Sequence, residues 1–207
     1  MKSIITLLII VQSICSSITL LGQDNKIDSL LNAYKKAKHD TTRCKIYLEI
    51  GDLFEYDNPD MAIYFYNKSL QLAVSKKLKK DEATSINSIG NVYIHHGIPD
   101  KALEYYLKSL IICKALGFKK ELSNCYGNIG NAHYLQGNYP KAIEYYLKSL
   151  KIKEELGDKK GISSSYGNIG SVYGCQRNFD KAIEYFLKSL KIDQEIGNKK
   201  RNGYQLQ

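Results

Sequence analysis

The stretch that determines the fold runs from residue 126 to residue 152 and reads YGNIGNAHYLQGNYPKAIEYYLKSLKI. Forty residues later, from 166 to 192, the chain reads YGNIGSVYGCQRNFDKAIEYFLKSLKI. When residues 121–160 are aligned with residues 161–200 without a gap, 23 of the 40 positions are identical. Self-similarity at a fixed period of this length indicates an array of structural repeats.

The same period extends toward the N-terminus. Residues 81–120 fit the frame directly, and residues 41–80 fit it with one residue deleted in the turn. We therefore expect four repeats, at 41–80, 81–120, 121–160 and 161–200. Residues 24–40 carry a single apolar stripe, typical of a helix that covers the first repeat, and residues 201–207 are a short tail.

Each repeat has the pattern of two helices joined by a turn. In the third repeat, Tyr126, Ile129 and His133 recur on one helical face, and Ala142 and Tyr146 recur on a second one. Strand patterns are absent, so the sequence predicts an all-α fold, a right-handed α-solenoid of helix-turn-helix repeats. The predicted helix pairs are 82–96 with 99–116, 121–136 with 139–156, and 162–176 with 179–196.

Residues at the helix ends support this assignment. Asparagine is a favoured N-cap, proline is tolerated in the first helical turn, and glycine favours the left-handed C-cap. The residues at such positions are Asn138 and Asn178, then Pro59, Pro99 and Pro140, and finally Gly117, Gly157 and Gly197.

These positions resemble the tetratricopeptide repeat, whose signature has an aromatic residue, a Leu-Gly pair and a second aromatic residue, followed by a small and a large residue in the second helix. The 40-residue period resembles the kinesin light chain and G-protein signalling modulator branch, which also recurs in bacterial regulators. The chain departs from the family in having no Trp, no proline at the repeat end, and 40 residues instead of 34. The matching residues are Tyr47, Ile50, Gly51, Phe54, Ala62 and Tyr66 in the first repeat; Ile89, Gly90, Tyr93, Ala102 and Tyr106 in the second; Tyr126, Ile129, Gly130, His133, Ala142 and Tyr146 in the third; and Tyr166, Ile169, Gly170, Tyr173, Ala182 and Phe186 in the fourth.

Residues 1–22 read MKSIITLLIIVQSICSSITLLG, with a lysine near the start and an apolar run after it. This composition is typical of a secretory signal, with cleavage after Gly22 or near Ser17. It predicts export to the periplasm or secretion. An uncleaved N-terminal membrane anchor is the alternative, since the apolar stretch reaches the lower length limit for a bilayer span.

The chain carries 30 Lys and Arg against 21 Asp and Glu, a net charge of +9. Lysine pairs recur at the same point of each repeat, which indicates either solubility near helix C-termini or a stripe for an acidic partner. Export argues against nucleic acid. The recurring pairs are Lys79-Lys80, Lys119-Lys120, Lys159-Lys160 and Lys199-Lys200.

A helical wheel places short amides and hydroxyls on the side of each first helix that is opposite the core. In the resembling family that side lines a concave groove. An asparagine side chain both donates and accepts, so a ladder of them can pair with the main chain of an extended peptide. The alternative is a solvated face that duplication has copied. The candidate peptide-binding residues are Thr84, Ser88, Asn91, His95, Asn124, Asn128, Asn131, Leu135, Ser164, Asn168 and Ser171.

No catalytic motif or metal-spaced cluster appears, so we expect no enzyme, no cofactor and no metal site. His133, in the position of a repeat tyrosine, reads as a core residue. Cys113 and Cys125 are the only pair symmetric about a predicted helix turn, and free thiols are favoured over a bridge because packed helix axes lie farther apart than the Cα atoms of a disulfide. The leading hypothesis is a noncatalytic interaction scaffold that binds a peptide or partner helix. The second is a sensory or regulatory input module of a bacterial signalling system, or a truncated member of a longer family with a kinase or DNA-binding domain.

The end of the array gives a separate expectation. A terminal repeat exposes the face that a following repeat would cover, and seven residues are too few for a covering helix. We therefore expect Ile183, Leu187 and Leu190 to be open. The chain would then self-associate through this face, bind a partner there, or belong to a longer family.

Overall fold

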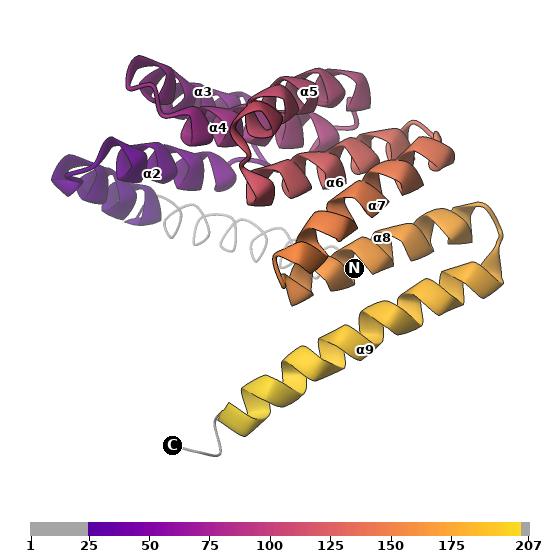
Figure 1. Cartoon of the computed structure of the whole chain (residues 1–207). Helices are drawn as coiled ribbons and strands as arrows, with labels where there is room; N and C mark the ends of the chain where they lie inside the picture. Colours follow the sequence, from indigo (N-terminus) through magenta and orange to yellow (C-terminus); the bar gives the residue numbers. More distant parts are fainter. Residues whose placement is uncertain (1–24, 204–207) are drawn as a thin grey trace, which may run out of the picture. The chain divides into compact units, whose positions relative to one another are not determined.

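The computed structural model describes residues 25–203, with side chains described as far as residue 197. The described part is almost entirely helical and contains no strand, so the all-α prediction is confirmed (Figure 1). The predicted signal segment at 1–22 and the last four residues of the predicted tail lie outside the described residues. Within the described range, no helix is both long enough and apolar enough to cross a membrane.

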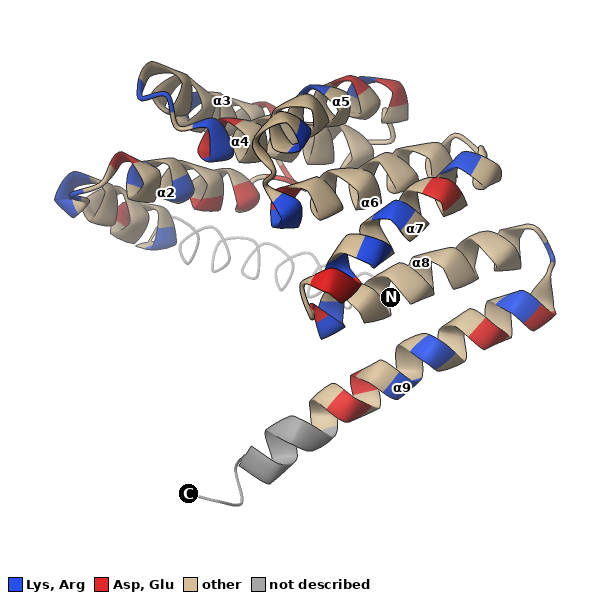
Figure 2. Ribbon diagram, in the orientation of Figure 1, with Lys and Arg blue, Asp and Glu red and all other residues tan. Residues whose placement is uncertain are grey.

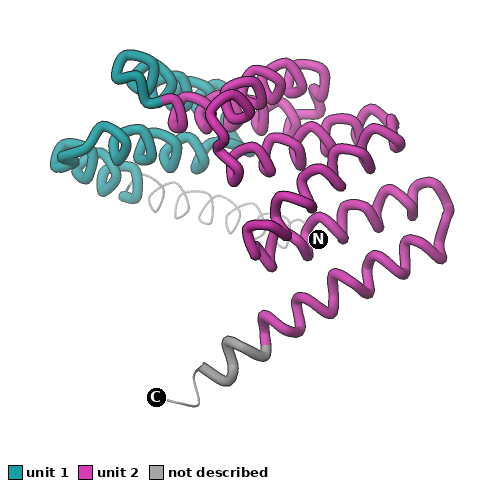
Figure 3. The backbone as a smooth tube through the Cα atoms, viewed as in Figure 1, with its two compact units in different colours: residues 1–78 teal, residues 79–207 magenta. Residues whose placement is uncertain are grey.

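The chain divides into two compact units, residues 1–78 and residues 79–207 (Figure 3). The first unit contains a helix over residues 25–36, followed by α2 (Asp40–Asp52) and α3 (Pro59–Ser75). The predicted apolar stripe is half-buried, and its Tyr34 ring lies 4.7 Å from the ring of Tyr47 on α2. This helix therefore packs on the first repeat.

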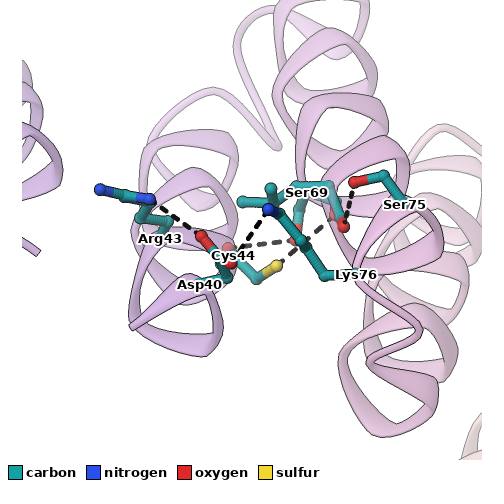
Figure 4. Close-up of polar contacts among 7 residues, drawn as sticks. Asp40, Arg43, Cys44, Ser69, Ser75 and Lys76 are labelled. Carbon is teal, nitrogen blue, oxygen red and sulfur yellow. Dashed lines mark hydrogen bonds and ion pairs between the residues drawn. The ribbon is translucent and has the colours of Figure 1, made fainter. Parts of the chain in front are cut away.

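A buried polar contact joins the two helices of the first repeat (Figure 4). The Ser69 hydroxyl on α3 donates to the Cys44 carbonyl on α2 at 3.1 Å, and the Cys44 thiol points back to the Ser69 carbonyl at 3.7 Å. Beside it, the Asp40 carboxylate pairs with Arg43 at 2.9 Å and with Lys76 at 3.6 Å. The partners lie at opposite ends of the hairpin sequence, so these contacts tie α2 to α3.

The second unit consists of three helical hairpins. Within each hairpin the two helices pack together, and α5 also contacts α6 as α7 contacts α8. The helices are α4 (Lys79–His95), α5 (Pro99–Leu116), α6 (Lys119–Leu135), α7 (Tyr139–Glu155), α8 (Lys159–Cys175) and α9 (Phe179–Gly203). Each first helix begins two or three residues earlier than predicted, so the lysine pairs open helices instead of following them.

A glycine on each first helix allows its hairpin to close. A Cβ atom added at Gly130 would lie 2.6 Å from ring carbons of Tyr146, and one added at Gly90 would lie 2.6 Å from Tyr106. Both tyrosines are almost fully buried, at 3% and 1% exposed. The aromatic ring therefore occupies the space that a side chain on the first helix would need.

The serine of each KSL motif has a structural role that the sequence analysis did not find. Ser109 on α5 donates to the Ala83 carbonyl at 2.7 Å, and Ser149 on α7 donates to the Ser123 carbonyl at 2.7 Å. Both serines are buried, so the hydroxyl needs a partner inside the hairpin. The repeated serine links the second helix to the first.

Most of the predicted helix-capping residues are confirmed. Asn138 and Asn178 accept hydrogen bonds from the backbone N–H groups three residues later, at 3.4 and 3.3 Å. Gly117 and Gly157 adopt left-handed conformations, with φ of 67° and 66°. Gly197, however, lies inside α9, which continues to Gly203, so its prediction as a C-cap is wrong. The predicted end at residue 196 fails for the same reason, since the lysine-rich segment after Gly197 continues the helix.

One side of α9 is open, as expected for a terminal helix. Ile183, Leu187 and Leu190 are 56%, 59% and 51% exposed. Phe186, which occupies the same repeat position as the buried Tyr146, is 45% exposed. Helix α8 thus covers one side of α9, and this apolar surface remains in contact with solvent.

Candidate functional site

Two adjoining cavities lie on the first helices of the second unit. The central cavity has a volume of about 310 Å³ and the apolar cavity about 270 Å³, and they share Asn131 and Asn168. We call them together the amide groove. The central cavity is lined by Asn87, Asn91, Asn124, Gly127, Asn128, Asn131, Lys153 and Asn168, and the apolar cavity by Ile94, Asn131, Tyr134, Leu135, Tyr146, Asn168 and Ser171.

Tyrosines from the second helices orient two of the groove amides. Tyr106 donates its hydroxyl to Asn91 Oδ1 at 2.9 Å, and Tyr146 donates to Asn131 Oδ1 at 2.7 Å. Burial raises the pKa of Tyr146 above its ordinary value, so the phenol keeps its proton and remains a hydrogen-bond donor. With the amide oxygen occupied, each residue keeps its Nδ2 donors for another partner.

Asn128 completes the arrangement between α4 and α6. Its Nδ2 group donates to Asn87 Oδ1 at 3.3 Å and to Asn91 Oδ1 at 3.1 Å. Within the described part of the chain, the Nδ2 groups of Asn87, Asn91 and Asn131 have no hydrogen-bond partner. Asn87, Asn91 and Asn128 therefore form a connected network, and the unused groups of these three residues and of Asn131 are mainly donors.

The structure brings seven of the eleven predicted residues to the amide groove and leaves four outside its two cavities. Thr84 lies in a small neighbouring cavity, His95 is exposed, Ser88 is half-buried, and Ser164 is exposed. The hydroxyls of Thr84 and Ser164 donate to carbonyls four residues earlier in their own helices. A hydroxyl bonded in this way has used its one donor, as Ser171 in the groove also has, and can only accept a hydrogen bond from a ligand. The seven residues in the groove are Asn91, Asn124, Asn128, Asn131, Leu135, Asn168 and Ser171.

Sequence reasoning missed several lining residues, of which Lys153 and Asn87 matter most. Lys153 stands where the second repeat has Cys113, which is fully buried. Asn87 stands where the third repeat has Gly127. A search for positions at which one repeat differs from the others, instead of positions that all repeats share, could have identified both residues.

Among the lysine pairs whose side chains the structure describes, Lys79, Lys80, Lys119 and Lys159 are ion-paired, which favours a local role over an open stripe for an acidic partner. Lys119 pairs with Glu155 at 2.9 Å, Lys159 pairs with Glu195 at 2.5 Å, and Lys80 pairs with Glu121 at 3.0 Å. The placement near helix C-termini was wrong, because the lysines open α4, α6 and α8. Positive charge is unfavourable at a helix N-terminus, and the carboxylates of neighbouring helices offset it.

Charge is distributed unequally between the two kinds of helix. In Figure 2 the ribbons of α6 and α8 are uncharged along most of their length, whereas acidic and basic residues alternate along α9. On α7 and α9 the pairs Glu144–Lys148 and Glu184–Lys188 form as expected for i,i+4 spacing. The ammonium groups lower the pKa of Glu144 and of Glu184 below the ordinary value. The polar side chains that the first helices contribute to the groove are therefore mainly neutral amides.

The histidine and cysteine residues that could carry chemistry in the second unit include three that are buried in its core. His133 is 7% exposed and stacks on Tyr145 with ring centroids 5.6 Å apart, as predicted for a core residue. Cys113 and Cys125 are free buried thiols, and the Ser109 hydroxyl lies 3.2 Å from the Cys125 sulfur. Across the described residues, no three His, Cys, Asp or Glu side chains gather closely enough to hold a metal ion.

A family model for the tetratricopeptide repeat matches residues 81–155 and 123–195, more than half of the chain. The chain therefore belongs to the tetratricopeptide repeat family, as the resemblance in the sequence implied. A search of curated proteins finds no match.

Several solved structures share the fold. BtubC from P. vanneervenii superposes with a TM-score of 0.69 at 19% identity, covering 86% of this chain and 78% of that one. A Rap protein complexed with competence and sporulation factor gives 0.73 at 16% identity, covering 86% of this chain and 51% of that one. A STAND protein with a tetratricopeptide repeat sensor from Pyrococcus horikoshii gives 0.70 at 22% identity, covering 86% and 28%. The chain thus spans about half the length of the Rap protein. At these identities the likeness shows the repeat solenoid fold alone.

Proposed function

We propose that this chain is a noncatalytic protein-interaction scaffold that binds an extended segment of a partner protein in the amide groove. The observation that carries the proposal is the row of amide donors held in place by buried tyrosines. An extended peptide presents a carbonyl oxygen at every residue, and fixed N–H groups are suitable partners for these oxygens.

The comparisons support this class of function without assigning a ligand. Tetratricopeptide repeat proteins serve as interaction modules, and the Rap protein was solved in complex with competence and sporulation factor. A regulatory input module is the second candidate, favoured by the likeness to a protein that carries a tetratricopeptide repeat sensor. Both candidates use the groove as the binding surface.

Replacing Asn124 and Asn168 together by Ala tests the groove. Within the described residues neither side chain makes a hydrogen bond of its own, so folding should be preserved or slightly improved by the better helix former. Removing two amide contacts should weaken binding about tenfold. The probe is a pool of random octapeptides, acetylated and amidated at their ends, and the readout is the fraction retained by the immobilised chain.

Ser164→Ala is the matched control. Ser164 occupies the same repeat position as Asn124, but its hydroxyl is bonded to its own helix and it lies outside both cavities. Its replacement should leave peptide retention unchanged. If the double variant retains as much peptide as the control, the groove is a solvated face and the proposal fails.

Asn131 is a poor choice for this test, although it lines both cavities. A triple variant of Asn128, Asn131 and Asn168 would include it. Asn131, however, accepts the hydroxyl of the buried Tyr146, and an unpartnered buried hydroxyl costs about 1–3 kcal/mol. Loss of binding in that triple variant would therefore mix binding with stability.

We also propose that the chain self-associates through the open face of α9. Leu187→Lys should weaken concentration-dependent association in sedimentation equilibrium, because it places a charge in the centre of the apolar surface. Ile111→Lys is the control, since Ile111 on α5 is 68% exposed and lies elsewhere in the second unit. A wild-type chain that remains monomeric at high concentration would refute the proposal.

A further inference from the structure

Lys153 is an unusual residue of the amide groove. It lies on α7, is partly buried, and lines the central cavity among six asparagines and a glycine. The second repeat has the fully buried Cys113 at this position, so a long cationic side chain has replaced a small neutral one. Burial lowers the pKa of Lys153, while the nearby Asp158 opposes this change.

The neighbouring repeat provides the space for this side chain. A Cβ atom added at Gly161 would lie too close to the Asp158 carboxylate and 2.8 Å from Cδ of Lys153, so the glycine makes room for the N-cap carboxylate and for the aliphatic stem of the lysine. The previous repeats have Glu121 and Asp81 where Gly161 stands, and an acid there would neutralise the ammonium. The Lys153 ammonium instead donates to the Ser165 hydroxyl at 3.2 Å. An ammonium has three N–H groups, so two N–H groups of Lys153 have no hydrogen-bond partner among the described residues.

The lining of the central cavity has no carboxylate to pair with this charge. Its eight residues comprise Lys153, six asparagines and one glycine. The oxygens of Asn87, Asn91 and Asn131 already accept hydrogen bonds from within the protein, so the N–H groups of these lining residues are the ones that remain unbonded. A cavity with one partly desolvated cation and several fixed N–H donors favours a negatively charged acceptor.

The neighbouring cavities indicate where in a ligand this acceptor lies. The central cavity shares Asn131 and Asn168 with the apolar cavity on one side, and shares Asn87 and Asn124 with a small cavity beside Thr84 on the other. A bound segment can therefore continue in both directions, which suits an internal residue better than a chain end. The apolar cavity, with Ile94, Tyr134 and Leu135, suits an aliphatic or aromatic side chain.

We propose that the central cavity around Lys153 binds the side-chain carboxylate of an Asp or Glu in the partner segment, with an apolar side chain of the same segment in the adjoining cavity. This inference rests on the proposed function, since it names the kind of segment that the amide groove takes. Specificity for acid thus comes from one partly buried lysine and the oriented amides around it. The lysine pairs at the helix starts do not line the cavity, and four of their six lysines are ion-paired.

The test compares Lys153→Met with Lys151→Met. Methionine fits a position that is apolar in the second repeat, so Lys153→Met should fold, with an unfolding midpoint equal to or above that of the wild type. Lys151 is exposed on the same helix, so its replacement makes the same change in net charge away from the groove. The probe is the pool of acetylated and amidated octapeptides, and the bound fraction is sequenced by mass spectrometry.

Peptides retained by the wild type should be enriched about tenfold in Asp or Glu within two residues of an aliphatic or aromatic residue. Lys153→Met should abolish the acidic enrichment and keep the apolar one, while Lys151→Met keeps both. Retention of peptides without acidic preference, or an acidic preference that survives Lys153→Met, overturns this inference and leaves the proposed function standing. Failure of the wild type to retain any peptide overturns both. In a second pool with free C-termini, enrichment that depends on the terminal carboxylate overturns the assignment to a side chain.

Discussion

Replacing Gly130 by Leu is expected to destabilise the second unit by about 3 kcal/mol. The physical reason is steric, because even a Cβ at this position would lie 2.6 Å from two ring carbons of Tyr146. The ring is 3% exposed and packed between α6 and α7, so it cannot move aside without opening the hairpin. Urea unfolding followed by circular dichroism at 222 nm measures the loss.

Gly174→Ala is the matched control for this prediction. Gly174 also lies in a first helix, and a Cβ there would meet nothing within 4 Å. The substitution should stabilise the protein by about 0.5–1 kcal/mol, because alanine is the better helix former. If alanine at residue 130 stabilised the protein as much as alanine at residue 174, the close approach of the two helices would not be the reason for Gly130.

Replacing Tyr146 by Ala should cost about 3–5 kcal/mol of unfolding free energy, the range found for large aromatic residues deleted from a core. The same substitution removes the donor that holds Asn131 Oδ1 at 2.7 Å. Tyr146→Phe separates the two effects, because it keeps the ring and loses only the hydrogen bond, at about 1 kcal/mol. Urea unfolding of both variants against the wild type gives the two values.

Leu147→Ala provides the comparison on the same helix. Leu147 is 44% exposed, so its truncation should change stability much less than that of Tyr146. Tyr146→Phe should also weaken retention of the octapeptide pool, since Asn131 is then free to rotate its amide. A fully stable Tyr146→Ala variant would contradict the role of the ring as the core of the hairpin.

In the fourth repeat, both residues of this tyrosine–asparagine hydrogen bond are replaced. Where the third repeat has Tyr146 and Asn131, the fourth has Phe186 and Ser171. The phenol and its amide acceptor are lost together, and the Ser171 hydroxyl donates to the Gly167 carbonyl of its own helix. The exchange was visible in the sequence, but only the hydrogen bond between Tyr146 and Asn131 explains it.

Periodicity and residue type alone determined the repeat architecture of this protein. Apolar residues at helical spacing, and a glycine opposite an aromatic residue in every repeat, leave few ways to pack a 40-residue unit other than a helical hairpin. The caps at Asn138 and Gly117 follow from local backbone preferences, so they were predictable as well.

Only the tertiary structure decided which polar residues line the two cavities. A helical wheel places Asn131 and Ser164 on equivalent polar faces of their helices. It does not show that Tyr146, on another helix, holds the Asn131 amide, or that the Ser164 hydroxyl bonds to its own backbone. It likewise treats Lys153 as one lysine among many, although the glycine eight residues later allows it to lie in the groove. Local pattern depends on neighbours in the chain, whereas burial and hydrogen bonding depend on neighbours in space, and for this reason the fold was readable from the sequence and the groove chemistry was not.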